Sequence, residues 1–495
     1  MANYFEQYDS SDPQSIEEYA KKLIGHSFKE IALFDHVEMH EDDIVETSYG
    51  QKTRKGGLGN FLEEQYFGYR ANSVSKADFE EAGVELKVSP FEKNNDGSMR
   101  AGERLVLSMI GYDKPIEDYF YDSHVWEKCK LILLIYYLRD RNVLNNLDYV
   151  IHFAELFTPP EEDLKIIEQD YDTIRRKIQA GKAHELSESD TLYLGACTKG
   201  ANAEKSTVPQ FYGERIPARK RAFCYKRSYM TYVLNNYLSN DSFNNRHDEQ
   251  IVKNAAELEY SSFEKIIEDK INSYIGKSDK ELCSLFDRQY NNNKAQWFDL
   301  TYRMLGITSN NAEEFSKANI RVRVIRLEEN NHMRESISFP PFKYKELIQE
   351  QWENSTLHDY FDQTKFLFVV FKKKSDCYVL MGCQFWNMPY EDLNNEVRNG
   401  WQKVVDTIKQ GVVFNFKDTK SGIIVQNNFP KKADNRIIHI RPHARKRYFE
   451  FSNGMIIGDG NRSDANQLPD GTWMPHYSFW INNDYILEQI GVEKK

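Results

Sequence analysis

The chain has 495 residues, of which 40% are hydrophobic and 14% aromatic, so it is long enough to form more than one well-filled core. Its net charge of −11 argues against indiscriminate nucleic-acid binding by the whole surface. The absence of an apolar run of about 18 residues excludes a predicted transmembrane helix, and the acidic, polar N-terminus is unlike a signal peptide.

The six cysteines are spread along the chain without a CxxC pair and without a histidine cluster beside them. This distribution favours reduced thiols and argues against a structural zinc site. We therefore expect a cytoplasmic protein that has no membrane partner.

The segment between residues 78 and 88 contains the first candidate catalytic residues. Apolar and charged residues alternate over 84–88, which predicts a β-strand with Glu85 and Lys87 on the same face. A second carboxylate, Asp78, lies just upstream. Two carboxylates and an ammonium at one point can hold Mg²⁺ and activate a water for attack on a phosphodiester. The spacing Asp-x6-Glu-x-Lys is typical of DNA-cutting nucleases, and the alternative is a solvated strand face with an ion pair.

Further along the chain, the pattern predicts both buried elements and charged surfaces. A continuous apolar run at 131–136 predicts a buried strand, and apolar residues at helical spacing predict a helix over 171–181 that ends in glycine. Basic residues cluster at 215–227 and again at 436–447, each time with aromatic neighbours. These clusters indicate nucleic-acid contacts, and the alternative is a pair of solvated basic loops.

The chain also resembles itself at a period near half its length. The corresponding segments, in the same order in both halves, are 24–31 with 275–282, 78–88 with 314–324, 131–136 with 366–371, 171–181 with 401–411 and 223–229 with 479–485. In the second half Arg321 and Arg323 replace Glu85 and Lys87, and two arginines cannot bind a divalent cation. Chance periodicity in an α/β chain is the alternative. The pattern predicts one copy with the carboxylates and one without them.

Strands and helices interleave in each half, so both halves are predicted to be α/β, or mixed α+β. The polar stretch at 239–246 predicts the join between a domain over 1–240 and a domain over 241–495. Helical patterns between 252 and 275 predict a helical linker at the start of the second domain.

Several separated segments resemble the MutH endonuclease family. They are 55–63, Asp78, 83–87 and 123–130 in the first half. That family includes the mismatch-repair nicking enzyme and type II restriction endonucleases of the Sau type, which cut at the DNA sequence GATC. Three further segments, 181–188, 197–203 and 478–486, extend the resemblance to the Sau-type enzymes over nearly the whole chain.

The resemblance implies a restriction-endonuclease-like fold, duplicated, with a catalytic N-terminal copy and a degenerate C-terminal copy. It also implies Mg²⁺ dependence, cleavage of double-stranded DNA at GATC, and a cognate methyltransferase in the same cell. One active centre per chain means that a double-strand cut needs two chains or two successive nicks. Dimerisation, or binding of a second site by the C-terminal half, is the hypothesis that meets this need.

The catalytic group that the resemblance implies is Asp78, Glu85, Lys87, Glu63, Lys128 and Lys55. Asp78 and Glu85 would ligate the metal, and Lys87 would orient the attacking water or stabilise the developing charge. Glu63 would be a further acid at the metal site, with an exposed helix residue as its alternative. The remaining two lysines would sit near the scissile phosphate, with surface lysines as their alternative.

Base reading is predicted for the loop at 194–203, which corresponds to the recognition loop of the family. The mismatch-repair enzyme has an Arg-Pro pair where this chain has Cys197-Thr198, so guanine reading by that arginine does not transfer. Lys199, or backbone groups of the loop, would replace it. Lys226 and Arg227, in the first basic cluster, are predicted DNA contacts.

The corresponding loop of the second half, 439–444, is closer to the family pattern and contains Arg441. We expect Arg441 to read guanine, so that the second half binds DNA without cleaving it. The alternative is a structural arginine that pairs with an acid of its own domain.

Three functional hypotheses follow from these observations. The first is a Mg²⁺-dependent type II restriction endonuclease. The second is a mismatch-repair nickase activated by a partner, although the nickase has no second half. The third is a non-catalytic DNA-binding or regulatory protein, against which the intact Asp78, Glu85 and Lys87 argue.

Overall fold

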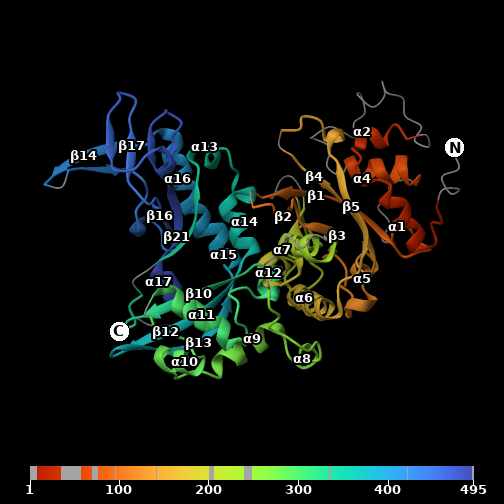
Figure 1. Ribbon diagram of the computed structural model, residues 1–495, viewed down its shortest axis with the longest axis horizontal. Helices are drawn as coiled ribbons and strands as arrows, with labels where there is room; N and C mark the ends of the chain where they lie inside the picture. The colour runs from red at the N-terminus through yellow and green to blue at the C-terminus, as the bar shows by residue number, and fades with distance from the viewer. Residues whose placement is uncertain are drawn as a thin grey trace. The chain divides into compact units, whose positions relative to one another are not determined.

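The computed structural model describes residues 8–34, 57–69, 76–94, 96–140, 142–199, 206–238, 248–291, 293–333, 336–420 and 422–492. The fold is mixed α/β, as predicted (Figure 1). The chain forms two compact units: unit 1 is Met1–Ile266 with Ile307–Ile320, and unit 2 is Ile267–Gly306 with Arg321–Lys495. None of the helices in the described ranges has the length and apolar character needed to span a bilayer.

Unit 1 therefore extends past the predicted boundary at residue 240, and the predicted join at 239–246 lies outside the described residues. Helix α12 (Glu313–Ala318) belongs to unit 1 because the buried Lys317 forms an ion pair of 2.7 Å with the buried Asp163. Helix α8 (Glu257–Tyr260) is held by Gln169, whose amide donates to the carbonyl oxygen of Leu258 at 2.8 Å. These long-range contacts cannot be seen in a local pattern.

Unit 1 contains two main sheets. The first has the order β2 (Met99–Ala101), β1 (Glu85–Lys93), β4 (Ile132–Leu138) and β5 (Ile151–Phe157). Strands β1 and β4 are parallel, and the other neighbours are antiparallel. The second sheet is antiparallel, with the order β3 (Leu105–Met109), β9 (Arg221–Tyr225) and β6 (Leu194–Thr198). The first five residues of β4 are fully buried, which confirms the buried strand predicted at 131–136.

Helices cover the first sheet of unit 1 and form its core. The N-terminal elements that pack there are α1 (Pro13–Lys21), α2 (Phe28–Ile31), α4 (Gly57–Phe61) and the π-helical turn η3 (Leu62–Tyr66). The other helices of the unit include α5 (His124–Glu127), α6 (Glu161–Gln179) and α7 (Arg227–Val233). Helix α6 ends near Gly181, which has φ +74° and lies so close to Gly213 that a Cβ would approach its Cα to 2.8 Å. Only glycine fits this helix end, as the sequence predicted.

Unit 2 also contains two main sheets. One has the order β10 (Ile320–Leu327), β12 (Lys365–Lys374) and β13 (Cys377–Trp386), and the other is antiparallel with the order β11 (Ile337–Phe342), β21 (Tyr477–Ile481) and β16 (Ile438–Pro442). Its helices include the greater part of α9 (Phe263–Asn272), which begins in unit 1, and α10 (Asp279–Leu285), α11 (Lys294–Met304), α13 (Tyr344–Leu347), α14 (Thr356–Gln363), α16 (Arg398–Gln410) and α17 (Asn483–Gln489). The apolar run at 366–371 lies in β12 and is buried, as predicted.

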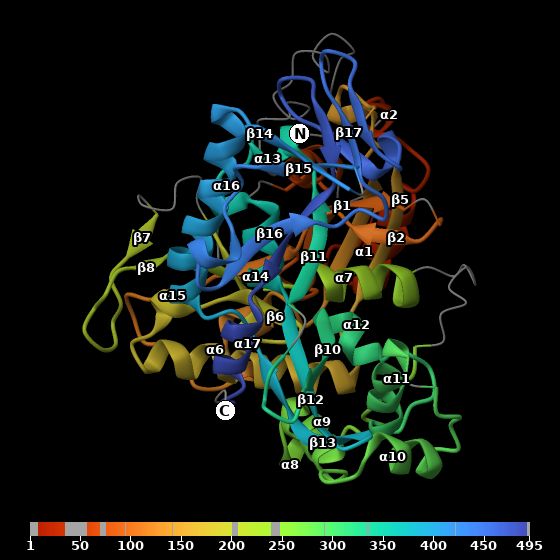
Figure 2. The same ribbon diagram turned by 90° about the vertical axis from the view of Figure 1, so that its left-hand side faces the viewer.

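Two further β structures lie in the connections that precede and follow β16, a strand of the second sheet of unit 2 (Figure 2). A two-stranded ribbon, β14 (Phe414–Thr419) with β15 (Gly422–Asn427), lies in the connection between α16 and β16. A four-stranded sheet of order β18 (Ile456–Gly458), β17 (Tyr448–Glu450), β20 (Trp473–Pro475) and β19 (Ala465–Gln467) lies between β16 and β21. In unit 1 the described connection between α6 and β6 contains only short 3₁₀ turns.

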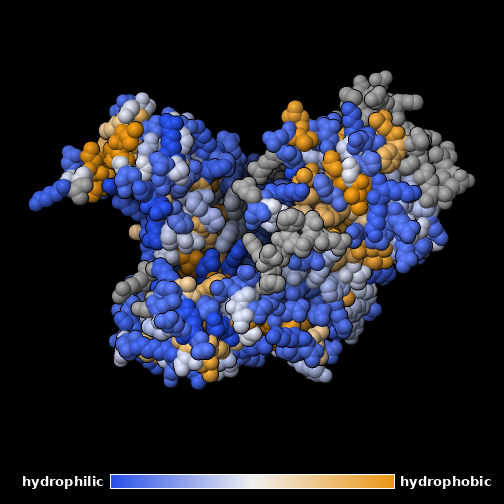
Figure 3. Space-filling model, in the orientation of Figure 1, coloured by the Kyte–Doolittle hydropathy of each residue, from blue (hydrophilic) through white to orange (hydrophobic). Residues whose placement is uncertain are grey.

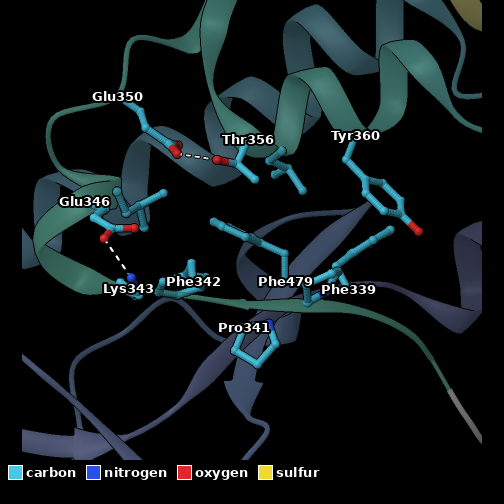
Figure 4. Close-up of a pocket in the computed structure, with 12 residues that line it drawn as sticks. Phe339, Pro341, Phe342, Lys343, Glu346, Glu350, Thr356, Tyr360 and Phe479 are labelled. Atoms are coloured by element: carbon cyan, nitrogen blue, oxygen red, sulfur yellow. Dashed lines mark hydrogen bonds and ion pairs between the residues drawn. The ribbon is translucent and has the colours of Figure 1, made fainter. Parts of the chain in front are cut away.

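Unit 2 has a cavity of about 200 Å³ between β11, α13 and α14 (Figure 4). Its walls are mainly apolar side chains: Phe339, Pro340, Pro341, Phe342, Leu347, Leu357, Tyr360 and Phe479. At its rim the Thr356 hydroxyl donates to Glu350 at 2.5 Å, and Lys343 pairs with Glu346 at 2.8 Å. No residue predicted to act on DNA lines this cavity.

Candidate active site

A tight turn brings Asp78 beside the start of strand β1. Phe79 and Val84 form an isolated antiparallel bridge, with N–H to O distances of 2.9 and 3.2 Å. Gly83 completes the turn with φ +65°, a left-handed conformation that favours glycine. The side chain of Asp78 then accepts a hydrogen bond of 2.9 Å from the backbone N–H of Leu86. The predicted pair Asp78 and Glu85 is thus held together by local backbone geometry.

Glu85 lies in the interior and faces two ammonium groups. It is 2% exposed, forms an ion pair with Lys87, and its Oε2 is 2.9 Å from Nζ of Lys128. Lys128 reaches this point because β1 and β4 are parallel, with Glu85 opposite Ile132, and Lys128 ends the helical turn just before β4. The Lys128 ammonium also donates to the backbone oxygen of Lys76. Asp78, Glu85, Lys87 and Lys128 therefore meet at one end of the parallel pair.

Glu63 faces the same group of charges from the turn η3. Burial, together with the nearby charge of Asp78, raises the pKa of Glu63 to about 7, and Lys87 opposes the shift. Burial and the charge of Glu85 likewise raise the pKa of Asp78 to about 6. Each shift reflects carboxylates that lose water and repel one another. A cation at this point would relieve that repulsion, because a bound metal ion reverses the local electrostatics.

Tyr69 is a site residue that sequence reasoning missed. Its hydroxyl is buried and has no hydrogen-bond partner among the described residues. Its ring packs edge-on against Phe79 at 5.3 Å, and its backbone N–H donates to the carbonyl of Glu63 at 3.0 Å. Burial first, and then the charges of Asp78, Glu63 and Glu85, raise the pKa of Tyr69 well above its ordinary value. Nothing in the sequence marks this tyrosine among the thirty in the chain.

The side chains fit a hard divalent cation by their chemistry. Asp78, Glu85 and Glu63 offer carboxylate oxygens, which Mg²⁺ prefers, and the buried Tyr69 hydroxyl lacks a partner. Within the described ranges, however, no three His, Cys, Asp or Glu side chains are arranged closely enough to hold a metal ion. Both oxygens of Glu85 are instead engaged by lysines. Lys55, predicted beside this site, lies outside the described residues.

The residues of unit 1 that were predicted to contact DNA differ in exposure: Lys199 and Arg227 are partly exposed, whereas Lys226 is buried. Lys199 is half-exposed just after β6, where its backbone N–H donates to the carbonyl oxygen of Lys220 at 2.8 Å, and the rest of the predicted loop, 200–203, lies outside the described residues. Arg227 is half-buried and donates from Nε to the carbonyl of Ala101 at 2.7 Å.

Lys226 is placed differently from the prediction. It is 2% exposed, and its ammonium donates to the backbone oxygen of Thr191. Burial raises the pKa of Asp170 to about 6, and the charge of Lys226 opposes this rise. The Asp170 carboxylate also accepts hydrogen bonds from the backbone N–H groups of Leu192, Tyr193 and Leu194. In this structure the Lys226 ammonium is buried against the backbone just before β6 and is not exposed to a nucleic acid.

In unit 2, Arg441 lies exposed on β16 and its guanidinium stacks 3.6 Å above the ring of Trp480. Its neighbour in the basic cluster, Arg436, pairs instead with Asp392 and Glu488 of the same unit at 3.0 and 2.7 Å. Three other members of the cluster, Arg445, Lys446 and Arg447, are exposed, and no ion pair with another described residue is found for them. His443 Nδ1 lies 2.8 Å from the Ser478 hydroxyl. The cluster is therefore partly structural and partly open to a ligand.

Comparison with known proteins agrees with this geometry. Residues 67–170, which contain Asp78, Glu85, Lys87 and Lys128, match the family described as DNA mismatch repair enzyme MutH. The DNA mismatch repair protein MutH of Shigella boydii is 26% identical over 228 residues, covering 45% of this chain and 93% of that protein. The MutH of Haemophilus influenzae is 25% identical over 46% of this chain and 97% of its own length. The chain therefore contains a MutH-like domain at residues 67–170.

One relative extends over nearly the whole chain. The type II restriction enzyme Sau3AI of Staphylococcus aureus is 35% identical over 508 aligned positions, covering 96% of this chain and 98% of that enzyme. The chain belongs to the family of Sau-type type II restriction endonucleases within the MutH-like enzymes. Of the three functional hypotheses, the type II restriction endonuclease is confirmed, and its dependence on Mg²⁺ stays a prediction. The MutH relatives match only about half of the chain.

Proposed function

We propose that this site-specific deoxyribonuclease cuts double-stranded DNA at GATC, requires Mg²⁺, and carries its only active centre in unit 1. The observation that carries the proposal is the buried Glu85, set between two ammonium groups and beside Asp78 at the start of β1. We expect it to act in the cytoplasm, where a cognate methyltransferase would protect the DNA of the cell.

Asp78 and Glu85 would hold Mg²⁺, with Glu63 as a further acid at the site. When bound, the ion would lower the pKa of a coordinated water and offset the negative charge that builds up on the phosphate. Lys87 would exchange its contact with Glu85 for the attacking water or the phosphate, because its side chain is partly exposed. Lys128 is anchored by the backbone of Lys76 and would fix the orientation of the Glu85 carboxylate.

We further propose that unit 2 is a degenerate copy of unit 1. The support is the strand order: β10–β12–β13 follows the pattern of β1–β4–β5, and β11–β21–β16 follows that of β3–β9–β6. At the positions that correspond to Glu85 and Lys87, β10 carries Arg321 and Arg323. With arginines there, unit 2 would bind DNA through Arg441 without cutting it, and two chains or two successive nicks would complete a double-strand break.

The test is digestion of plasmid by the purified protein with Mg²⁺, followed by sequencing of the ends. Ends that fall at GATC, and only with an added divalent cation, are expected. Ends at unrelated sequences would refute GATC cleavage. Full activity in a chelator would refute the metal dependence.

A further inference from the structure

The ribbon formed by β14 and β15 presents one uncovered face. The other face packs against Phe451 of the same unit, since the rings of Phe414 and Phe416 lie 5.3 Å from the Phe451 ring, and Phe416 stays 49% exposed. Side chains of directly opposite residues share a face, and successive residues alternate between faces. The register pairs Asn415 with Gln426 and Lys417 with Ile424, so these four side chains belong to the uncovered face. All four residues are exposed.

This face carries the kinds of side chain that read base edges. Amide side chains such as Asn415 and Gln426 donate to and accept from adenine, lysine donates to guanine, and an aliphatic side chain such as Ile424 contacts the thymine methyl. Neither Lys417 nor Lys420 forms an ion pair with another described residue. Their only acidic neighbour on the ribbon, Asp418, points to the opposite face because it pairs with Ile423.

The ribbon lies at the end of the sheet that carries Arg441. At the base of the ribbon, Asn427 donates from its amide to the hydroxyl of Tyr477 at 2.8 Å, and Tyr477 is directly opposite Pro442, the neighbour of Arg441. The segment that follows Pro442 contains the exposed basic residues 445–447. In a chain with a net charge of −11, this end of the unit gathers positive charge. Phosphate is the complementary partner for such a surface.

We propose that the β14–β15 ribbon enters the major groove of DNA with its Asn415, Lys417, Ile424 and Gln426 face toward the bases. This inference rests on the proposed DNA binding by unit 2 and adds the element that enters the groove. Each strand has six residues and is about 20 Å long. A two-stranded ribbon fits the major groove, which is about 12 Å wide. The basic residues 445–447 would then contact the flanking phosphates, and Arg441 would reach a guanine beside the ribbon.

Hydrophobic residues also lie exposed in the region of β14 and β17, where Figure 3 shows an apolar group on the face in view. Val413, Phe416 and Ile456 are 57%, 49% and 60% exposed. They would favour a protein partner if they stood alone. The basic and amide side chains beside them favour DNA, and self-association is kept as an outcome of the test.

The experiment uses the full-length protein in a chelator, so that the DNA stays uncut, and titrates it with a short GATC duplex. Two duplexes per chain are expected, one for each unit. Lys417→Ala combined with Gln426→Ala should weaken the second binding event roughly tenfold or more, since a base contact of this kind is lost at each position. The matched control is Lys277→Ala combined with Gln349→Ala, which removes the same residue types from exposed positions elsewhere in unit 2. A second variant, Lys417→Glu, reverses the charge without changing a buried side chain.

Replacing guanine by 7-deazaguanine removes an acceptor from the major groove and should weaken the second event for the wild type, and by less for the ribbon variants, which keep Arg441 but lack Lys417. Netropsin, which fills the minor groove, should have little effect. If netropsin blocks the second event and 7-deazaguanine does not, the major-groove assignment is wrong.

If Arg441→Ala weakens the event while the ribbon variants match their control, the ribbon is not involved, although unit 2 still binds DNA. If only one duplex binds per chain and neither Arg441 nor the ribbon matters, DNA binding by unit 2 is itself wrong. A ribbon variant that changes the oligomeric state and leaves DNA affinity unaltered would assign the face to self-association.

Discussion

Replacing Glu85 tests the active site and its electrostatics together. Glu85 is 2% exposed, and its two oxygens face the ammonium groups of Lys87 and Lys128. Glu85→Ala would leave Lys128 buried with a single backbone acceptor, the carbonyl of Lys76. Breaking a buried ion pair in this way typically costs about 3–5 kcal/mol. We expect about 3 kcal/mol, at the lower end, because Lys87 is partly exposed and water can solvate it.

The double variant Glu85→Gln with Lys128→Met separates the two effects. Removing both charges eliminates the uncompensated ammonium, so the free energy of unfolding should recover most of the loss seen for Glu85→Ala. Cleavage should not recover in either variant, because the loss of a metal ligand raises the barrier and each ~1.4 kcal/mol is tenfold in rate. Urea unfolding measures the stability, plasmid cleavage with Mg²⁺ measures the rate, and DNA binding should be retained. Near-normal cutting by Glu85→Ala would remove Glu85 from the mechanism, and additive destabilisation in the double variant would refute the ion-pair argument.

Further variants test the other residues. Tyr69→Phe should keep the fold and lower turnover about tenfold, because it removes a buried hydroxyl beside the carboxylates. The control is Tyr66→Phe, which loses a hydrogen bond to the carbonyl oxygen of Tyr19 and should lower stability but leave turnover per folded molecule unchanged. Lys226→Ala should reduce the free energy of unfolding by about 3 kcal/mol, because it leaves the buried Asp170 without its counter-charge, and urea melts will show no such loss if the lysine is dispensable. Arg321→Ala, in unit 2, should leave the rate of plasmid cleavage unchanged, and a large drop would mean that β10 takes part in catalysis. Arg441→Ala should lower the preference of the second binding event for GATC over a scrambled duplex about tenfold, and an equal loss for both duplexes in a salt series would identify Arg441 as a phosphate contact.

The sequence predicted the parts of this molecule that depend on local pattern. The buried strands at 131–136 and 366–371 were visible because a continuous apolar run needs no knowledge of its neighbours. The proximity of Asp78 and Glu85 was also predictable, since a short turn ending in Gly83 joins them. Such features are fixed by a few consecutive residues.

The features that the sequence did not predict depend on contacts between distant segments. Tyr69 joins the site only because the end of η3 folds against Phe79. Lys226 reads as part of a basic surface, but its ammonium turns inward toward Thr191 and Asp170. Lys317 belongs to unit 1, although residues 267–306 before it belong to unit 2, because it forms an ion pair with the buried Asp163. From the sequence alone, a buried charged side chain cannot be told from an exposed one, because its partner lies far away along the chain.

The arrangement of the sheets explains how cleavage and recognition can change separately. In unit 1 the proposed catalytic group sits at the start of β1, in the sheet that also contains β4, whereas the predicted recognition loop, 194–203, begins with β6 in the other sheet. If unit 2 is a copy, its first sheet lost the carboxylates when arginines appeared on β10, and that change did not touch the second sheet. On the same proposal, the second sheet would have kept Arg441 on β16 and gained the ribbon in the connection that precedes it. Because the proposed metal ligands and the proposed base-reading groups reside on different sheets, one unit could lose cleavage and still bind DNA.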